Sequence, residues 1–194
     1  MSHEPDSTNL LRALAPVLRE FGNRWYVFGA QAVVVWGRPR LTADVDVTCF
    51  LDPDDPTAFA AAMWRGGFEL RVRDAAGFVE TTRVLPFIHR ATGLPVDIVL
   101  AGPGLEEEFE RAAVRIDVHG TTIPFIAAED LIVTKVLAGR PKDLEDVRGI
   151  LLARHATLDI EHVRARLRLL EAALGQSDFL PLLEEQVAST RQRP

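Results

Sequence analysis

The sequence predicts an α/β fold in which a small mixed β-sheet is flanked by helices and followed by a helical C-terminal region. Three observations lead to this prediction. Helical and strand-like patterns alternate as far as Phe125, short turns join two pairs of strand-like segments, and only helical patterns follow from Ala127 onward. We therefore expect an α/β core over residues 1–125 and a helical region over residues 126–194.

The individual elements follow from the spacing of apolar residues. A helical period indicates a helix, a period of two or a short apolar run indicates a strand, and Gly or Pro marks the ends. In chain order we expect helix 9–21, strand 25–28, helix 30–36, strand 44–50, helix 58–65, strand 68–72, a hairpin of strands 84–89 and 94–100, helix 105–113, a second hairpin within 113–125 that turns at Gly120, and helices 127–137, 142–153, 160–174 and 178–189.

The composition is that of a globular protein with a core of its own. The 194 residues are 47% hydrophobic and 26% charged, which argues against a disordered chain. The first 25 residues contain six charged side chains and no long apolar run, so we expect a soluble, cytoplasmic protein without a signal peptide or membrane span. The formal charge of −6 argues against a protein that coats nucleic acid, and the single cysteine, Cys49, excludes an internal disulfide.

Two aspartates on one expected strand are the first candidates for a functional site. Asp44 and Asp46 are two residues apart, so their side chains share one face, where their repulsion is unfavourable unless they share a cation. Mg²⁺ accepts such oxygen ligands and keeps positions open for phosphates. Asp97 interrupts a later apolar strand. If that strand lies beside the first, three carboxylates converge and can hold two metal ions about 4 Å apart for in-line phosphoryl transfer.

A site for phosphates is expected just before these aspartates. Gly29 separates an expected strand from an expected helix, so the first amides of that helix, from Ala30 on, would point at an anion. Arg40 and Thr42 lie between this turn and Asp44, where they can meet phosphate oxygens with a charge and a hydroxyl.

This ordered set resembles the nucleotidyltransferase superfamily related to DNA polymerase beta, and most closely the AbiEii-like nucleotidyltransferases, the toxins of type IV toxin-antitoxin systems. The resemblance covers most of the chain, from Trp25 to Leu152. It rests on Gly29-Ala30, on Arg40-x-Thr42-x-Asp44-Val45-Asp46, on Asp97, on a helix with Lys135, and on Arg140-Pro141-Lys142-Asp143-Leu144-Glu145-Asp146.

The resemblance implies a nucleotidyltransferase fold and transfer of NMP from an NTP to an acceptor hydroxyl. The acceptor would be RNA such as tRNA, and an antitoxin protein would be a partner. By the same resemblance Asp44 and Asp46 bind Mg²⁺ or Mn²⁺, and Asp97 helps to activate the acceptor, directly or as a ligand of a second metal ion. The implied nucleotide-binding residues are Gly29, Ala30, Arg40, Thr42 and Lys135, with Lys142, Asp143 and Asp146 as a second-half motif.

Two other functions stay open. Family members usually have Gly-Ser or Gly-Gly in the turn, and Ala30 removes one phosphate-binding hydroxyl, which favours a degenerate fold that binds without turnover. The net negative charge suits a cationic small-molecule acceptor, of the kind that aminoglycoside nucleotidyltransferases use.

Simpler interpretations exist for single residues. Asp97 could neutralise a buried arginine, and without the resemblance Lys135 would be a surface lysine. Lys142 and Asp146 have the spacing of an exposed ion pair, and His89, next to a turn, would lie on the surface.

Overall fold

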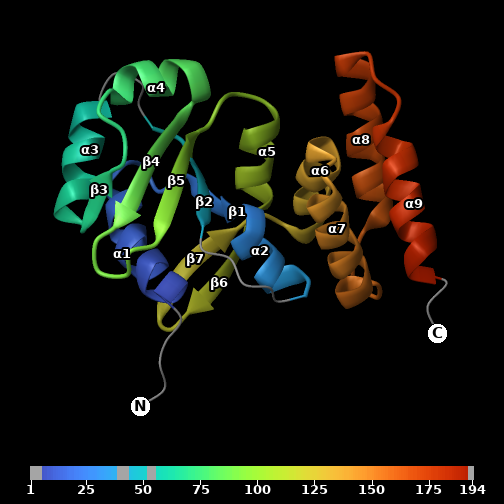
Figure 1. The fold of residues 1–194 in the computed structure, drawn as a ribbon. Coiled ribbons are helices and arrows are strands. Elements are labelled where there is room, and N and C mark those ends of the chain that lie inside the picture. The colour runs from blue at the N-terminus through green and yellow to red at the C-terminus, as the bar shows by residue number, and fades with distance from the viewer. Residues whose placement is uncertain (1–5, 39–43, 52–55, 192–194) are drawn as a thin grey trace. The chain divides into compact units, whose positions relative to one another are not determined.

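The computed structural model describes residues 6–38, 44–51 and 56–191, and the chain divides into two compact units. Among the described residues, the first unit (1–31 and 41–126) is built on a seven-stranded sheet with the order β3-β4-β5-β2-β1-β7-β6 (Figure 1). The pairs β2·β5 and β1·β7 are parallel and the others antiparallel, which confirms the predicted mixed sheet. The strands are β1 (Trp25–Phe28), β2 (Val45–Cys49), β3 (Phe68–Leu70), β4 (Val84–His89), β5 (Pro95–Leu100), β6 (Val114–Val118) and β7 (Thr121–Phe125).

Helices pack against both faces of this sheet. On one face Phe59 meets Phe87 of β4, with ring centroids 6.2 Å apart. On the other face Phe109 contacts Tyr26 of β1, with centroids 6.5 Å apart. The apolar residues of the core therefore come from both sides of the sheet. The helices of this unit are α1 (Asp6–Glu20), α3 (Pro56–Arg65), which carries Phe59, α4 (Ala75–Thr82) and α5 (Leu105–Ala112), which carries Phe109.

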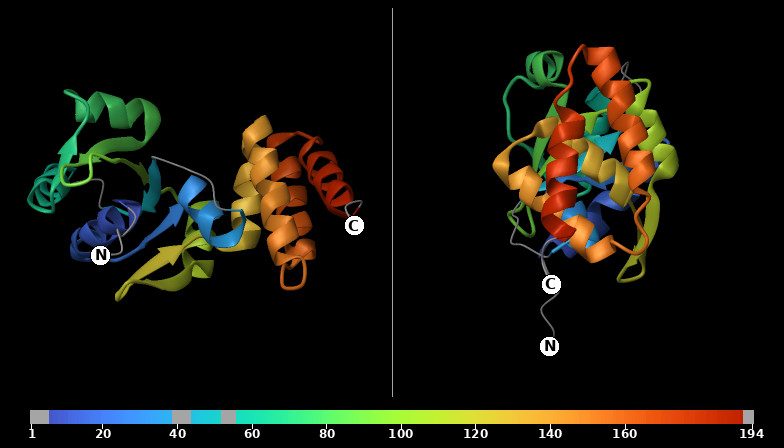
Figure 2. Two further views of the ribbon diagram at one scale, coloured as in Figure 1. Left: turned by 60° about the horizontal axis from the view of Figure 1, so that its bottom comes forward. Right: turned by 90° about the vertical axis from the view of Figure 1, so that its right-hand side faces the viewer.

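The second unit (32–40 and 127–194) consists of helices, as the sequence predicts for this region. Helix α6 contacts α7 and α8, and α9 packs against α7 and α8, an arrangement that Figure 2 shows from two sides. Arg154 of α7 donates hydrogen bonds to the carbonyls of Val35 and Trp36 in α2, at 3.2 and 3.4 Å. The helices are α6 (Ala128–Ala138), α7 (Pro141–Arg154), α8 (Ile160–Leu174), α9 (Phe179–Arg191) and most of α2 (Gly29–Trp36), which begins in the first unit. In the described ranges, no helix combines the length and apolar character needed to cross a membrane.

One helix is not predicted from the sequence. The other elements lie within three residues of their expected ends, but α4 forms where no element is expected. The side chain of Asp74 caps α4 by accepting a hydrogen bond from the Gly77 N–H at 3.0 Å. This helix buries no residue and contains Gly and Thr, which are weak helix formers. A search for apolar periodicity does not detect a helix that has an N-cap but no amphipathic pattern, and α4 is such a helix.

Cys49, the single cysteine, belongs to the core of the first unit. It lies in β2 and is 1% exposed, and burial raises the pKa of its thiol to about 12. Because the thiolate is the reactive form of cysteine, this side chain acts as a packed apolar group.

A buried carboxylate lies between α6 and α8. Asp130 is 1% exposed, and its Oδ1 has no hydrogen-bond partner among the described residues. The Nε2 atom of His162 lies 3.5 Å away, which is long for a hydrogen bond. Burial raises the pKa of Asp130 above its ordinary value, and His162 offsets only part of that effect.

The raised pKa of Asp130 means that its charged form is less favourable in the folded protein than in the unfolded chain. The folded protein holds a proton on Asp130 more tightly than the unfolded chain, so the cost in stability grows as the pH rises from the ordinary carboxyl pKa and is complete above the raised pKa. We expect Asp130→Asn to raise the free energy of unfolding at pH 7.5 by about 1–2 kcal/mol, because an amide needs no charge solvation. Urea denaturation at pH 7.5 and pH 4 measures the effect, which should shrink at pH 4.

A matched control is Glu145→Gln, which removes an exposed carboxylate of α7 and should change stability little at either pH. An equal gain from Asp130→Asn at both pH values would mean that packing, and not charge, is responsible.

Candidate functional site

Two of the predicted aspartates lie on neighbouring strands. β2 and β5 are parallel, and their register places Asp46 directly opposite Asp97. The strand adjacency that converging carboxylates require is therefore present. Residues opposite each other on adjacent strands project from the same face, so both side chains start from one side of the sheet.

The Gly29 turn meets the sheet at the same point. Phe28, the last residue of β1, lies opposite Asp46. Gly29 has φ +63°, and a Cβ atom at this position would be 2.1 Å from Oδ2 of Asp46. Glycine is required both by this backbone conformation and by the Asp46 carboxylate, which occupies the place of a side chain. The first turn of α2 contains no acidic residue that would repel an anion, so its amide N–H groups can donate hydrogen bonds to one.

Asp97 has a cationic partner from the edge of the sheet. Arg71 directly follows β3, and its Nη2 donates a hydrogen bond to Oδ1 of Asp97. The side chains are 39% and 38% exposed, so this is not the buried arginine of the simpler interpretation. An ion pair with this exposure adds little to stability.

Three further residues are predicted for the same site. Asp44 precedes β2 and is exposed, while Arg40 and Thr42 lie outside the described residues. Within 6–38, 44–51 and 56–191, no three His, Cys, Asp or Glu side chains form a cluster that could hold a metal ion. The strands are adjacent as expected, but the three carboxylates do not form one such cluster among these residues.

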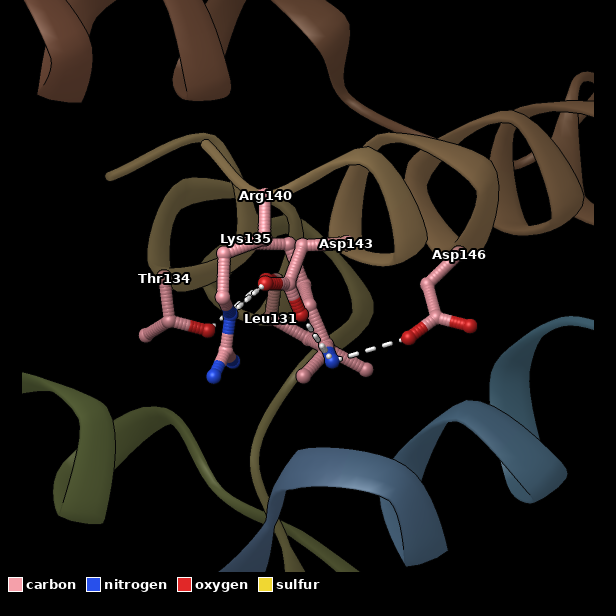
Figure 3. A network of polar contacts seen from close by, with 6 residues as sticks. All are labelled: Leu131, Thr134, Lys135, Arg140, Asp143 and Asp146. Atoms are coloured by element: carbon pink, nitrogen blue, oxygen red, sulfur yellow. Dashed lines mark hydrogen bonds and ion pairs between the residues drawn. The ribbon is translucent and has the colours of Figure 1, made fainter. Parts of the chain in front are cut away.

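Lys135 is the centre of a buried polar network in the second unit (Figure 3). Its Nζ donates to Oδ1 of Asp143 and to Oδ2 of Asp146, both at 2.8 Å, and none of the three side chains is more than 8% exposed. Arg140 donates from its Nε to the other oxygen of Asp143. Gly139, with φ +60°, ends α6 and lets the chain turn into α7. Two cations thus face two carboxylates and link α6 to α7.

These contacts decide between the interpretations of the second-half motif. Lys135 is a buried ion-pair residue and not a surface lysine. An exposed pair of Lys142 with Asp146 is wrong, because Asp146 is buried against Lys135 while Lys142 is exposed. Burial alone would raise the pKa of Asp143, but the hydrogen bonds from Arg140 and Lys135 hold it below its ordinary value.

Arg71 is not predicted from the sequence as a site residue, and the predicted surface location of His89 is wrong. Arg71 has no marked spacing in the sequence, and only the strand order brings it to Asp97. His89 is 5% exposed, not a surface residue, and its Nδ1 lies 2.9 Å from Oγ1 of Thr92. Burial and the charge of Arg90 lower the pKa of His89, which keeps the ring neutral at pH 7.

Solved structures share this fold at low sequence identity. The solution structure of the antibiotic-resistance factor ANT(2'')-Ia is 16% identical, with a TM-score of 0.58 over 87% of this chain and 95% of that chain. An antigenic nucleotidyltransferase-like protein from Paracoccidioides brasiliensis is 16% identical, with a TM-score of 0.57 over 92% of each chain. ANT(2")-Ia in complex with adenylyl-2"-tobramycin is 13% identical, with a TM-score of 0.56 over 84% of this chain and 98% of that chain. The fold is that of a nucleotidyltransferase.

A family model gives the finer assignment. The model of a nucleotidyltransferase of unknown function (DUF6036) matches residues 67–176, which are 110 of the 194 residues. The chain belongs to this family of nucleotidyltransferases. The matched segment contains Arg71, Asp97 and the Lys135 network, whereas Gly29 and Asp46 precede it. No curated protein sequence matches the chain.

The contact of Gly29 with Asp46 leads to a prediction. We expect Gly29→Ala to displace the Asp46 carboxylate and to abolish nucleotide binding measured by titration calorimetry with Mn²⁺. Gly93→Ala is the matched control, because Gly93 has a similar φ of +70° but a Cβ atom there would meet nothing within 4 Å. Both variants should lose about 1–2 kcal/mol of stability to backbone strain. Equal nucleotide affinity in the two variants would show that Asp46 does not need the Gly29 turn.

The Lys135 network leads to a second prediction. Lys135→Met keeps the length of the side chain but leaves two buried carboxylates without their ammonium, so we expect a loss of about 3–5 kcal/mol in the free energy of unfolding. Lys142→Met alters the other lysine of the chain, which is exposed, and should change stability by less than about 0.5 kcal/mol. Urea denaturation measures both. Similar losses in the two variants would contradict a stabilising role of the network.

Proposed function

We propose that this nucleotidyltransferase transfers NMP from an NTP to an acceptor hydroxyl with the help of a divalent cation, and that Asp44, Asp46 and Asp97 are its catalytic carboxylates. The observation that carries the proposal is the meeting of three elements at one place on the sheet. The Gly29 turn lies against Asp46, and Asp46 lies opposite Asp97 on the neighbouring strand. A phosphate-binding turn beside paired carboxylates is what phosphoryl transfer needs.

The residues fit a hard divalent cation. Asp46 lies in β2 and Asp44 directly precedes that strand, so both would offer carboxylate oxygens, the ligands that Mg²⁺ and Mn²⁺ prefer. When bound, the cation would neutralise charge on the triphosphate. The amides at the start of α2 would hold phosphate oxygens, and Gly29 keeps this approach open because it has no side chain. Arg40 and Thr42 would add a charge and a hydroxyl to the same phosphates.

The reaction balances without a further reactant. The acceptor oxygen forms a bond to the α-phosphorus, while the bond from that phosphorus to the bridging oxygen breaks and pyrophosphate leaves with the electron pair. Asp97 would accept the proton of the acceptor hydroxyl, since it lies opposite Asp46 on the same face. In the second unit, Lys135 holds Asp143 and Asp146 and would act through them, so its contribution to nucleotide binding would be indirect.

For the acceptor we propose RNA, such as tRNA, and for the protein the role of a toxin that an antitoxin partner controls. The resemblance of the Lys135–Asp146 segment to AbiEii-like toxins supports this choice. The exposed side chain of Arg71, which binds Asp97, also supports it, because it would attract an anionic acceptor.

A small hydroxylated compound is the second candidate acceptor. A solved structure with the same fold contains adenylyl-2"-tobramycin, and the formal charge of −6 would suit a cationic compound. One experiment separates the two acceptors. The purified protein is offered each labelled NTP with total RNA, tRNA, protein and aminoglycosides, and label on tRNA alone supports the first proposal. Label on an aminoglycoside supports the second, and nucleotide binding without any transfer supports a degenerate binding fold.

The role of Asp97 can be tested separately from that of the other two aspartates. We expect Asp97→Asn to lower single-turnover transfer by about 10²–10⁴-fold while nucleotide and Mn²⁺ affinity stay near those of the wild type, because an amide cannot accept the proton. Asp44→Ala/Asp46→Ala should instead lose Mn²⁺ binding in the presence of nucleotide. Transfer at the wild-type rate by folded Asp97→Asn would remove Asp97 from the mechanism.

A further inference from the structure

Arg71 and Asp97 belong to one row of residues across the sheet. The Arg71 N–H donates to the carbonyl of Pro86 at 2.9 Å. Pro86 lies opposite Asp97, and Asp97 lies opposite Asp46. Residues of one row project from the same face. The hydrogen bonds of the sheet therefore set the place of Arg71 on the face that carries the carboxylates.

The side chain of Arg71 reaches Asp97 across a whole strand. Neighbouring strands are about 4.8 Å apart, so the backbones of β3 and β5 are separated by about 10 Å with β4 between them. Pro86, in that gap, is buried and has no polar side-chain atom that could compete for the guanidinium. Among the described residues, Arg71 is the charged group that binds Asp97.

We propose that Arg71 is a positioning residue that holds Oδ1 of Asp97, leaves Oδ2 for the proton of the acceptor, and keeps Asp97 out of the coordination shell of the divalent cation. This inference rests on the proposed function and makes it more specific. The cation is then held by Asp44, Asp46 and the phosphates alone, and Asp97 acts directly on the acceptor rather than as a ligand of a second metal ion.

Two physical arguments support this role. A guanidinium and a divalent cation on the same carboxylate would repel each other, and the guanidinium already occupies one oxygen. The planar fork of arginine also fixes the direction of the carboxylate, which lysine cannot do as well. A purely structural role is a poor explanation, because the pair is more than a third exposed and contributes little to stability.

The test compares Arg71→Ala, Arg71→Lys and Arg73→Ala with the wild type. Arg73 is the matched control, because it is an exposed arginine two residues further along the chain. Thermal melting should be the same for all four proteins. The first measurement counts bound Mn²⁺ by electron paramagnetic resonance at saturating α,β-methylene NTP. We expect one Mn²⁺ per chain in the wild type and in Arg73→Ala, and two in Arg71→Ala, where Asp97 becomes available as a ligand.

The second measurement follows single-turnover transfer and nucleotide affinity on the same preparations. Arg71→Ala should transfer about 10²-fold more slowly with nucleotide affinity close to that of the wild type, because Asp97 is no longer oriented. Arg71→Lys should recover part of the rate. Two Mn²⁺ in the wild type, one Mn²⁺ in Arg71→Ala, or weaker nucleotide affinity with an unchanged rate would each overturn the proposal. The last result would make Arg71 a phosphate ligand.

The outcomes also separate this inference from the proposed function. A wild-type protein that transfers no label to any acceptor counts against the proposed function, and the Mn²⁺ count still tests Arg71. An active wild type with an unaffected Arg71→Ala counts against the role of Arg71 alone.

Discussion

The parallel pairing of β2 with β5 is the constraint on which the first unit depends. β2 lies in the middle of the sheet, with β1 on one side and β5 on the other. The pairing with β1 brings the Gly29 turn to Asp46, and the pairing with β5 places Asp97 opposite Asp46. Across β4, the same row of residues continues to Arg71 at the end of β3. A slip of one residue would turn Asp97 toward the opposite face, where Val96 and Ile98 are fully buried. The apolar core therefore sets the register that places Asp97 opposite Asp46.

Local patterns in the sequence are sufficient to predict the helices and strands, but not to predict which of them are neighbours in the fold. The alternation over 44–50 predicts which face of β2 carries the aspartates, because strand periodicity is a property of the strand alone. The neighbours of a strand depend on contacts distant in sequence. The sequence puts Asp97 beside Asp46 only on the condition that their strands are neighbours. It gives no position for Arg71, because the partner of Arg71 is 26 residues away and on another strand. Helix α4 is not predicted for a local reason, because it contains weak helix formers.

The Lys135 network shows the same limit within helices. Spacing of four residues pairs side chains on one helix, so the sequence favours Lys142 as the partner of Asp146. In the structure the turn at Gly139 brings the start of α7 back to α6, and the ammonium of Lys135 takes both aspartates. Burial makes these contacts selective, because each charge that lost its partner would stay out of reach of water. The pairing thus fixes how α6 and α7 pack against each other.

The burial of Cys49 has a practical consequence for spectroscopy on this protein. Alkylating dyes react with an accessible thiolate, and a thiol with a pKa of about 12 that is 1% exposed is neither ionised nor accessible at neutral pH. Because the chain has no other cysteine, a cysteine introduced on the surface would be the sole reactive thiol. Fluorophores or spin labels can therefore be attached to single chosen positions in a background that keeps Cys49 and the packing of β2 intact.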